Sequence, residues 1–141
     1  KFLKETIDND SDSYILYFHV KGASKNNVKP IHDLRFLLEY YNIVNYKKCI
    51  ELLDTGYCTV GILYSEGMIS QWPHYSGNFW WANSDYIKKL PKLNKVNILP
   101  LERGEFWICS KTDRIHVVAE NAPVDLYMNH YCIPSDFPDG F

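Results

Sequence analysis

The sequence lacks a charge excess of one sign and a long apolar run. Its 15 basic and 17 acidic residues leave a net charge of −2, which gives no field that would attract nucleic acid or an anionic membrane surface. No apolar stretch approaches the ~20 residues that cross a bilayer, and no secretory leader is visible. We therefore expect neither a nucleic-acid partner nor a membrane span in these 141 residues.

Paired cysteines are also absent from the sequence. The four cysteines are far apart and form no Cys-x-x-Cys motif. Most of them lie in apolar runs, where a reduced thiol behaves as a small hydrophobe. We therefore predict free thiols rather than disulfides, which favours the cytoplasm over an oxidising compartment. They are Cys49, Cys58, Cys109 and Cys132.

Aromatic residues are abundant, at 16% of the chain with eleven Tyr and four Trp. Such side chains bury a large area while offering a polar atom, so they suit an ordinary core and its rim. Their rings also stack on the C–H faces of sugars. Composition favours the core and leaves a carbohydrate site open.

The chain begins with Lys1 and crosses an acidic, polar stretch before its first apolar run. We therefore expect further sequence upstream, and interpret residues 1–141 as a single α/β domain that is a fragment of a longer protein. A chain of 141 residues is long enough to fold around one core.

Two short apolar runs flank a helical segment and predict a parallel sheet. Tyr14 to Phe18 and Tyr57 to Tyr64 are rich in aromatic and branched residues, as strands buried on both faces are. Between them Asp33 is placed to cap one helix, and a second begins near Asn45 and stops at Gly56. We therefore expect an α/β fold with a mainly parallel sheet flanked by helices, and a right-handed crossover.

Further elements are predicted after the second strand. They are an aromatic strand at Asn78 to Ala82, a helix capped by Ser84 that ends at Leu90, one or two helical turns within Glu102 to Cys109, and a strand at Ile115 to Ala119. The segments from Ser65 to Ser76 and from Pro134 to Phe141 are predicted to be irregular.

Polar residues follow the first predicted strand directly. They are His19, Lys21, Gly22 and Ser24, and open α/β sheets bind ligands at the ends of their strands. Lys21 offers a point charge for a phosphate, and Gly22 lets the backbone approach closely. An ordinary turn explains the same residues, because this is not a glycine-rich phosphate fingerprint.

A second candidate site is the aromatic segment from His74 to Ala82. Trp80 and Trp81 are adjacent on a predicted strand and point to opposite faces, so at most one belongs to the core of a one-sided layer and the other faces a cleft or partner. Gly77 before Asn78 suggests a tight bend that presents the Asn amide to a pair of hydroxyls. An aromatic packing cluster above a turn is the alternative.

A third candidate combines charge with an apolar run. Glu102, Arg103 and Glu105 stand within four positions, directly before Phe106 and Trp107. Low-dielectric surroundings would suit Glu105 as a general base, with Arg103 orienting it or binding an anion. A solvated helix face is the commoner explanation of clustered charge.

Taken in order, these motifs resemble a poorly characterised family of glycosyltransferases of the GT-A type, with bacterial, viral and eukaryotic members. The resemblance runs from about Tyr14 to Trp107. It includes H-x-K-G-x-S at 19–24, D-x-R at 33–35 and R-G-E-F-W at 103–107, and its most specific element is G-N-F-W-W at 77–81. Leu34 stands where the family often has Trp.

The resemblance implies a GT-A-like, Rossmann-related fold and transfer of a sugar from a nucleotide-sugar donor to a hydroxyl of a glycan or lipid-linked acceptor. Glu105 would be the general base, with inversion if the attack is direct. The donor diphosphate would bind His19, Lys21, Gly22, Ser24 and Arg103. The sugar or acceptor would bind His74, Gly77, Asn78, Trp80 and Trp81.

The resemblance also bears on metal dependence. Many GT-A enzymes have Asp-x-Asp after the corresponding strand, where this chain has His19-Val20-Lys21. A lysine neutralises a leaving diphosphate without a metal, and a lone imidazole is a poor site for a hard cation. We therefore expect no metal or other cofactor on these residues, with a divalent ion entering only through upstream sequence.

Two other function classes stay open. A non-catalytic carbohydrate-binding module would use Trp80 and Trp81 as a platform. A hydrolase would need Glu102 and Glu105 across a scissile bond, which a three-residue separation on one helical turn does not itself provide. Binding of a nucleotide would favour the enzyme over the binding module.

Overall fold

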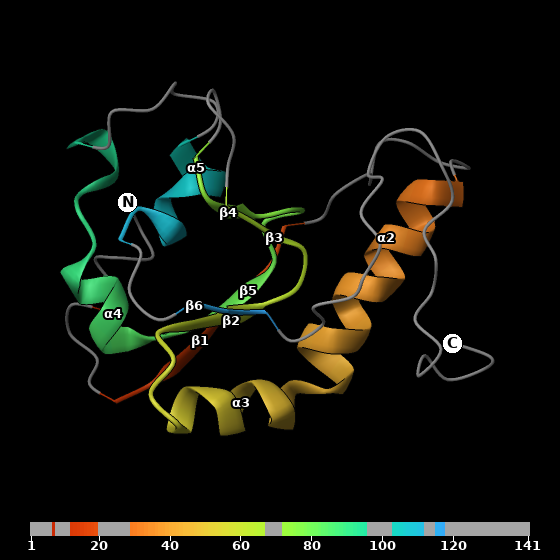
Figure 1. Ribbon diagram of the computed structural model, residues 1–141, viewed down its shortest axis with the longest axis horizontal. Helices are drawn as coiled ribbons and strands as arrows, with labels where there is room; N and C mark the ends of the chain where they lie inside the picture. Colours follow the sequence, from red (N-terminus) through yellow and green to blue (C-terminus); the bar gives the residue numbers. More distant parts are fainter. Residues whose placement is uncertain are drawn as a thin grey trace.

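The strands of the main sheet are ordered β1-β5-β2-β6 (Figure 1). The computed structural model describes residues 7, 12–19, 29–66, 72–95, 103–111 and 115–117. The strands are β1 (Tyr14–Tyr17), β2 (Thr59–Gly61), β3 (Tyr64–Ser65), β4 (His74–Tyr75), β5 (Trp80–Asn83) and β6 (Ile115–Val117). The helices are α2 (Lys29–Glu39), α3 (Tyr46–Asp54), α4 (Ser84–Lys89) and α5 (Arg103–Phe106), with the π-helical turn η1 (Tyr40–Val44) and the 3-10 turns η2 (Leu93–Lys95) and η3 (Trp107–Cys109).

The sheet is not mainly parallel, so the predicted fold class is wrong. β5 lies between β1 and β2 and is antiparallel to both, with Tyr17 and Gly61 each opposite Trp80. Among the pairings of this sheet in the described residues, only that of β2 with β6 is parallel. The expected parallel sheet of GT-A-like type is therefore replaced by a mixed sheet with an antiparallel centre.

The connection between β2 and β5 explains this arrangement. The helices α2 and α3 carry the chain from β1 to β2, and these strands run the same way on either side of β5. After β2 the chain forms the two-stranded sheet of β3 and β4, in which Tyr64 is opposite Tyr75. This hairpin returns the chain to the edge where β2 ended, so the next strand runs back antiparallel to β2.

Helices cover both faces of the sheet, and each face has its own hydrophobic packing. Side chains alternate between the faces along β5. Trp80 and Ala82 pack toward α4, α5 and η3, whereas Trp81 packs toward α3. In Figure 1, α3 lies below the sheet and α5 above it. A further cluster joins α2 and η1 to the residues that follow β2 and precede β5. Its buried members are Leu34, Leu37, Leu38, Tyr41, Ile62, Leu63 and Phe79.

The end of α3 follows the prediction. Gly56 has a φ of 92°, a conformation that suits glycine at the residue after a helix cap. The N–H of Gly56 donates to the oxygen of Leu53 at 2.9 Å, and that of Tyr57 to the oxygen of Leu52 at 3.4 Å. These two bonds form a Schellman motif, so the helix stops where the sequence predicts.

The helix starts differ from the prediction. Helix α2 begins at Lys29, so Asp33 lies inside the helix and does not cap it. The cap of α4 is Asn83 rather than Ser84, because the Asn83 side chain accepts a hydrogen bond from the N–H of Tyr86 at 2.7 Å. Serine and asparagine cap helices about equally well, so residue preference alone does not choose between neighbours.

Candidate functional site

The end of β1 lies beside the start of β5, because the two strands are antiparallel. Phe18 directly follows β1 and Phe79 directly precedes β5, and their ring centroids are 5.7 Å apart. The next residues outward are His19, which is exposed, and Asn78, which is half-buried. We call this end of the sheet, where β1 and β2 end and β5 begins, the motif edge. Of the first candidate site, the structure describes His19 at this end of the sheet, where Asn78 of the second candidate site also lies.

A β-turn from Tyr75 to Asn78 leads into β5. The N–H of Asn78 donates to the oxygen of Tyr75 at 3.0 Å, and Gly77 at the third position has a φ of 86°, which suits glycine. A Cβ on Gly77 would lie 2.8 Å from Cδ1 of Leu38 in α2. The tight bend predicted at Gly77 is confirmed, and both its backbone angle and its packing require glycine.

The side chain of Asn78 joins the second candidate site to the third. Its Oδ1 accepts a hydrogen bond from Nε1 of Trp80 at 2.9 Å. Its Nδ2 donates to the carbonyl oxygen of Gly104 in α5 at 3.5 Å. Both ends of the amide are therefore bonded within the chain, and in this arrangement Asn78 positions α5 rather than presenting a free amide.

A second contact holds α5 at the motif edge. The imidazole of His74 packs edge-on against the ring of Phe106, with 5.0 Å between centroids. Glu105 lies between the two contact residues of α5, Gly104 and Phe106, and is half-buried. The structure therefore brings the segment that carries Glu105 to the turn that carries Asn78.

The two adjacent tryptophans both pack against hydrophobic clusters. Trp80 is 1% exposed and its ring stacks on that of Tyr17 at 5.0 Å. Trp81 is half-buried against α3, and its Nε1 donates to the oxygen of Asn42 at 2.8 Å. Trp80 therefore belongs to the buried core and Trp81 does not, which agrees with the prediction that at most one of them is a core residue. Trp81 packs on α3 because helices cover both faces of the sheet.

Part of the predicted donor site lies outside the described residues. This applies to Lys21, Gly22 and Ser24, and to the side chain of Arg103. Their roles in binding a diphosphate stay predictions. His19, directly before this segment, is the residue of the first motif that the structure places at the motif edge.

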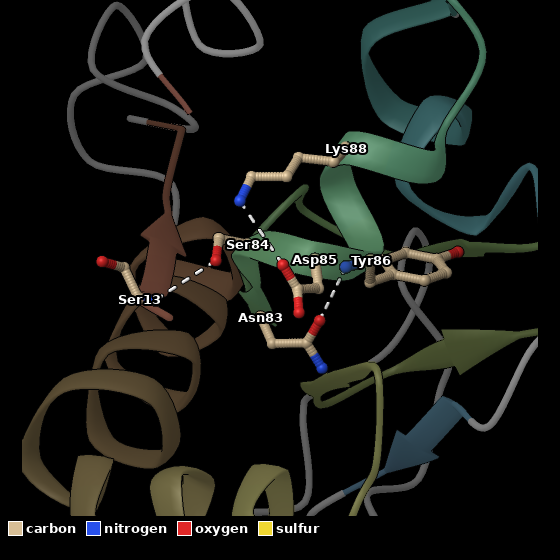
Figure 2. Close-up of polar contacts among 6 residues, drawn as sticks. All are labelled: Ser13, Asn83, Ser84, Asp85, Tyr86 and Lys88. Atoms are coloured by element: carbon tan, nitrogen blue, oxygen red, sulfur yellow. Dashed lines mark hydrogen bonds and ion pairs between the residues drawn. The ribbon is translucent and has the colours of Figure 1, made fainter. Parts of the chain in front are cut away.

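A hollow of about 330 Å³ lies at the opposite edge, where β1 begins and β5 ends. Several of the polar groups around it are hydrogen-bonded or ion-paired within the chain, as Figure 2 shows for residues in and next to α4. The N–H of Ser13 donates to Oγ of Ser84 at 3.2 Å, and the N–H of Ser84 donates to the oxygen of Ser13 at 2.8 Å. Lys88 pairs with Asp85 at 3.4 Å. These polar residues serve the junction of β1 with α4.

The thiols and phenols beneath the motif edge are held in their neutral forms. Burial raises the pKa of the Cys109 thiol to about 12. Burial also raises the pKa of Tyr75 well above its usual value, although its hydrogen bond with Thr59 acts in the opposite direction. Cys49 and Cys109 form no disulfide, as predicted, and Cys132 lies outside the described residues. These groups therefore contribute packing rather than a nucleophile.

The sequence analysis did not identify Trp72, an exposed aromatic residue two positions before His74, as a candidate site residue. Trp72 is 46% exposed and lies in the segment predicted to be an irregular loop. Its carbonyl oxygen is 2.9 Å from Nδ1 of His74. The available signal was a tryptophan directly before Pro73, because the residue before a proline is restricted to extended conformations.

Within the described residues, no group of three or more His, Cys, Asp or Glu side chains is arranged to hold a metal ion. The described helices are all too short or too polar to cross a membrane. No protein-family model, curated protein or solved structure matches the chain. The functional argument therefore rests on the motif edge itself.

Proposed function

We propose that the chain belongs to a glycosyltransferase that moves a sugar from a nucleotide-sugar donor to a hydroxyl of a glycan or lipid-linked acceptor, at the motif edge. The observation that carries the proposal is the bond from Asn78 to Gly104. This bond, with the packing of His74 on Phe106, joins two segments that are separate in the sequence. It brings the helix that carries Glu105 to the turn that we propose binds the sugar.

Glu105 has the role of general base in this proposal. It takes the proton of the acceptor hydroxyl while that oxygen attacks the anomeric carbon of the donor sugar. The bond from this carbon to the diphosphate oxygen breaks, and the diphosphate leaves with the electron pair. Direct attack of this kind inverts the configuration at the anomeric carbon.

The leaving diphosphate needs positive charge or hydrogen-bond donors as it forms. Lys21 and Arg103 supply the charge in this proposal, and His19 supplies a hydrogen-bond donor. Exposed His19 stands at the end of β1, from which the chain continues directly to Lys21. We propose that these side chains reduce the need for a divalent ion.

Thermal unfolding with nucleotide sugars tests the proposal. UDP-glucose, UDP-N-acetylglucosamine and GDP-mannose are added with and without Mn²⁺, because a ligand that binds only the folded state stabilises it by about 2.7 kcal/mol at a hundredfold excess over Kd. We expect stabilisation by at least one nucleotide sugar, with little change when divalent ions are removed. Stabilisation by free saccharides but by no nucleotide sugar would instead identify a carbohydrate-binding module, and no stabilisation by either would contradict both.

A further inference from the structure

Three of the four tryptophans have their indole N–H groups hydrogen-bonded within the chain. The indole N–H groups of Trp80, Trp81 and Trp107 each donate to an oxygen of the chain, at 2.8 or 2.9 Å. Trp80 and Trp107 are 1% and 8% exposed, whereas Trp72 is 46% exposed. Trp72 therefore offers a ring surface to solvent that the two most buried tryptophans do not.

Trp72 lies on a braced segment beside α5. Nδ1 of His74 is 2.9 Å from the carbonyl oxygen of Trp72, and the His74 ring packs against Phe106, the residue after Glu105. Pro73 fixes its own φ and restricts Trp72 to extended conformations. The backbone of Trp72 is thus linked through His74 to the segment that carries the proposed base.

The hydrogen bond of His74 also fixes what its imidazole offers to a ligand. A carbonyl oxygen only accepts, so Nδ1 carries the proton in the bond to Trp72. In the neutral ring Nε2 then has a free lone pair, which accepts a hydrogen bond. An acceptor and an exposed aromatic ring are therefore two residues apart in the chain.

We propose that a pyranose ring of the substrate stacks on the indole of Trp72 and that one of its hydroxyls donates to Nε2 of His74. This inference rests on the proposed transfer at the motif edge and gives the sugar platform to Trp72 rather than to Trp80 or Trp81. Stacking removes apolar surface of the indole and of the sugar C–H groups from water. The braced backbone lowers the conformational entropy lost on binding.

The test measures saccharide affinity of Trp72 variants by calorimetry. The probes are UDP-glucose, UDP-N-acetylglucosamine and the methyl glycosides of the two sugars. Trp72→Ala is expected to weaken the best-bound probe roughly 10- to 100-fold, the range expected for burying a large apolar side chain. Trp72→Phe keeps an aromatic face and is expected to retain most of the affinity. The matched control is Tyr46→Ala on α3, since Tyr46 is 45% exposed.

Fluorescence gives a second readout that a change in folding does not imitate. Binding is expected to shift the tryptophan emission of the unsubstituted chain to shorter wavelength as Trp72 is covered. In Trp72→Phe the shift is expected to vanish while calorimetry still detects binding, which keeps the inference testable if Trp72→Ala does not fold.

The outcomes separate the inference from the proposed function. Unchanged affinity in Trp72→Ala, or an unchanged shift in Trp72→Phe, overturns the role of Trp72 and leaves the proposed function in place. Failure of the unsubstituted chain to bind GDP-mannose or any of the four probes contradicts the proposed function and this inference with it.

Discussion

Each end of β5 carries an asparagine whose amide is bonded at both ends, but the two ends of the strand differ in their surroundings. Asn83 joins the backbone of α4 to that of the segment before β2, at 2.7 and 3.3 Å. Asn78 joins Trp80 to the backbone of α5, at 2.9 and 3.5 Å. Both asparagines hold the fold together, so the amide alone does not distinguish a site from a helix cap.

The neighbouring polar groups make the distinction. Beside Asn83, Ser13 and Ser84 bond each other at the hollow, and these bonds join the start of β1 to α4. Beside Asn78, His19 is exposed and Glu105 is half-buried on a helix held by two separate contacts. A concave surface lined by polar residues is therefore not by itself evidence of a binding site, because its polar groups can already be hydrogen-bonded within the chain.

The largest expected effect is on catalysis at the motif edge. Glu105→Gln keeps the shape of the side chain and removes the base, so we expect turnover to fall roughly 10²- to 10⁴-fold while sugar binding is largely retained. The matched control is Glu51→Gln, an exposed carboxylate on α3. The measurement for both variants is the rate at which the product of sugar transfer forms. Full activity in Glu105→Gln would show that Glu105 is not the general base.

The next effect is on the turn that leads into β5. Gly77→Val places a β-branched residue at a positive φ and pushes its Cβ against Leu38, so we expect a loss of about 2–5 kcal/mol in the free energy of unfolding. Gly104→Ala is the matched control, because a Cβ at Gly104 meets nothing within 4 Å. Urea unfolding checks the pair. Equal stability of the two variants would show that the turn is not packed on α2 as described.

A smaller effect tests the burial of Cys109 in η3, through the pH dependence of the free energy of unfolding. Burial raises the pKa of Cys109 from 9.0 to about 12, so the unfolded chain loses this proton first and stability falls as the pH rises above 9. Between pH 8 and 10 the contribution of Cys109 to the free energy of unfolding should fall by about 1.4 kcal/mol. In Cys109→Ala the decline over this range should be smaller by that amount. An identical decline in both proteins would mean that the thiol is not buried.

The smallest effect separates the two asparagines. Asn83→Ala removes the cap of α4 and is expected to cost about 1 kcal/mol of stability, with no change in nucleotide-sugar affinity. Asn78→Ala removes bonds of similar number, and we expect it to weaken ligand binding as well because it frees α5. Urea unfolding and calorimetry on both variants check this difference. Equal binding by both would contradict the division between the two edges.

Local features of the fold were predictable from the sequence. Gly56 and Gly77 mark positions where the backbone itself requires glycine, and such requirements depend on few neighbours. The capping of α4 was less predictable, since Ser84 is a good cap and its hydroxyl is taken by Ser13, 71 residues away. The burial of Trp80 and the partial burial of Trp81 depend on helices on both faces of the sheet, which no local pattern reveals.

The sheet brings His19 and Asn78 to the same end through an antiparallel strand that the sequence analysis did not predict. Parallel strands would have brought their carboxyl ends to one edge, whereas here β5 starts at the edge where β1 and β2 end. The hairpin in which Tyr64 pairs with Tyr75 makes this return. Pairing between short strands depends on contacts distant in sequence, and hydrophobic periodicity does not encode it.

Hydrogen exchange with and without a nucleotide sugar tests the division between the two edges most directly. The amides of the described chain are compared in the free protein and with the UDP-glucose, UDP-N-acetylglucosamine or GDP-mannose that stabilises it best. We predict added protection at Phe18 and His19, in the turn from Tyr75 to Asn78 and in α5, with none at the hollow around Ser13 and α4. Protection centred on the hollow, or no protection at the motif edge, would contradict the account.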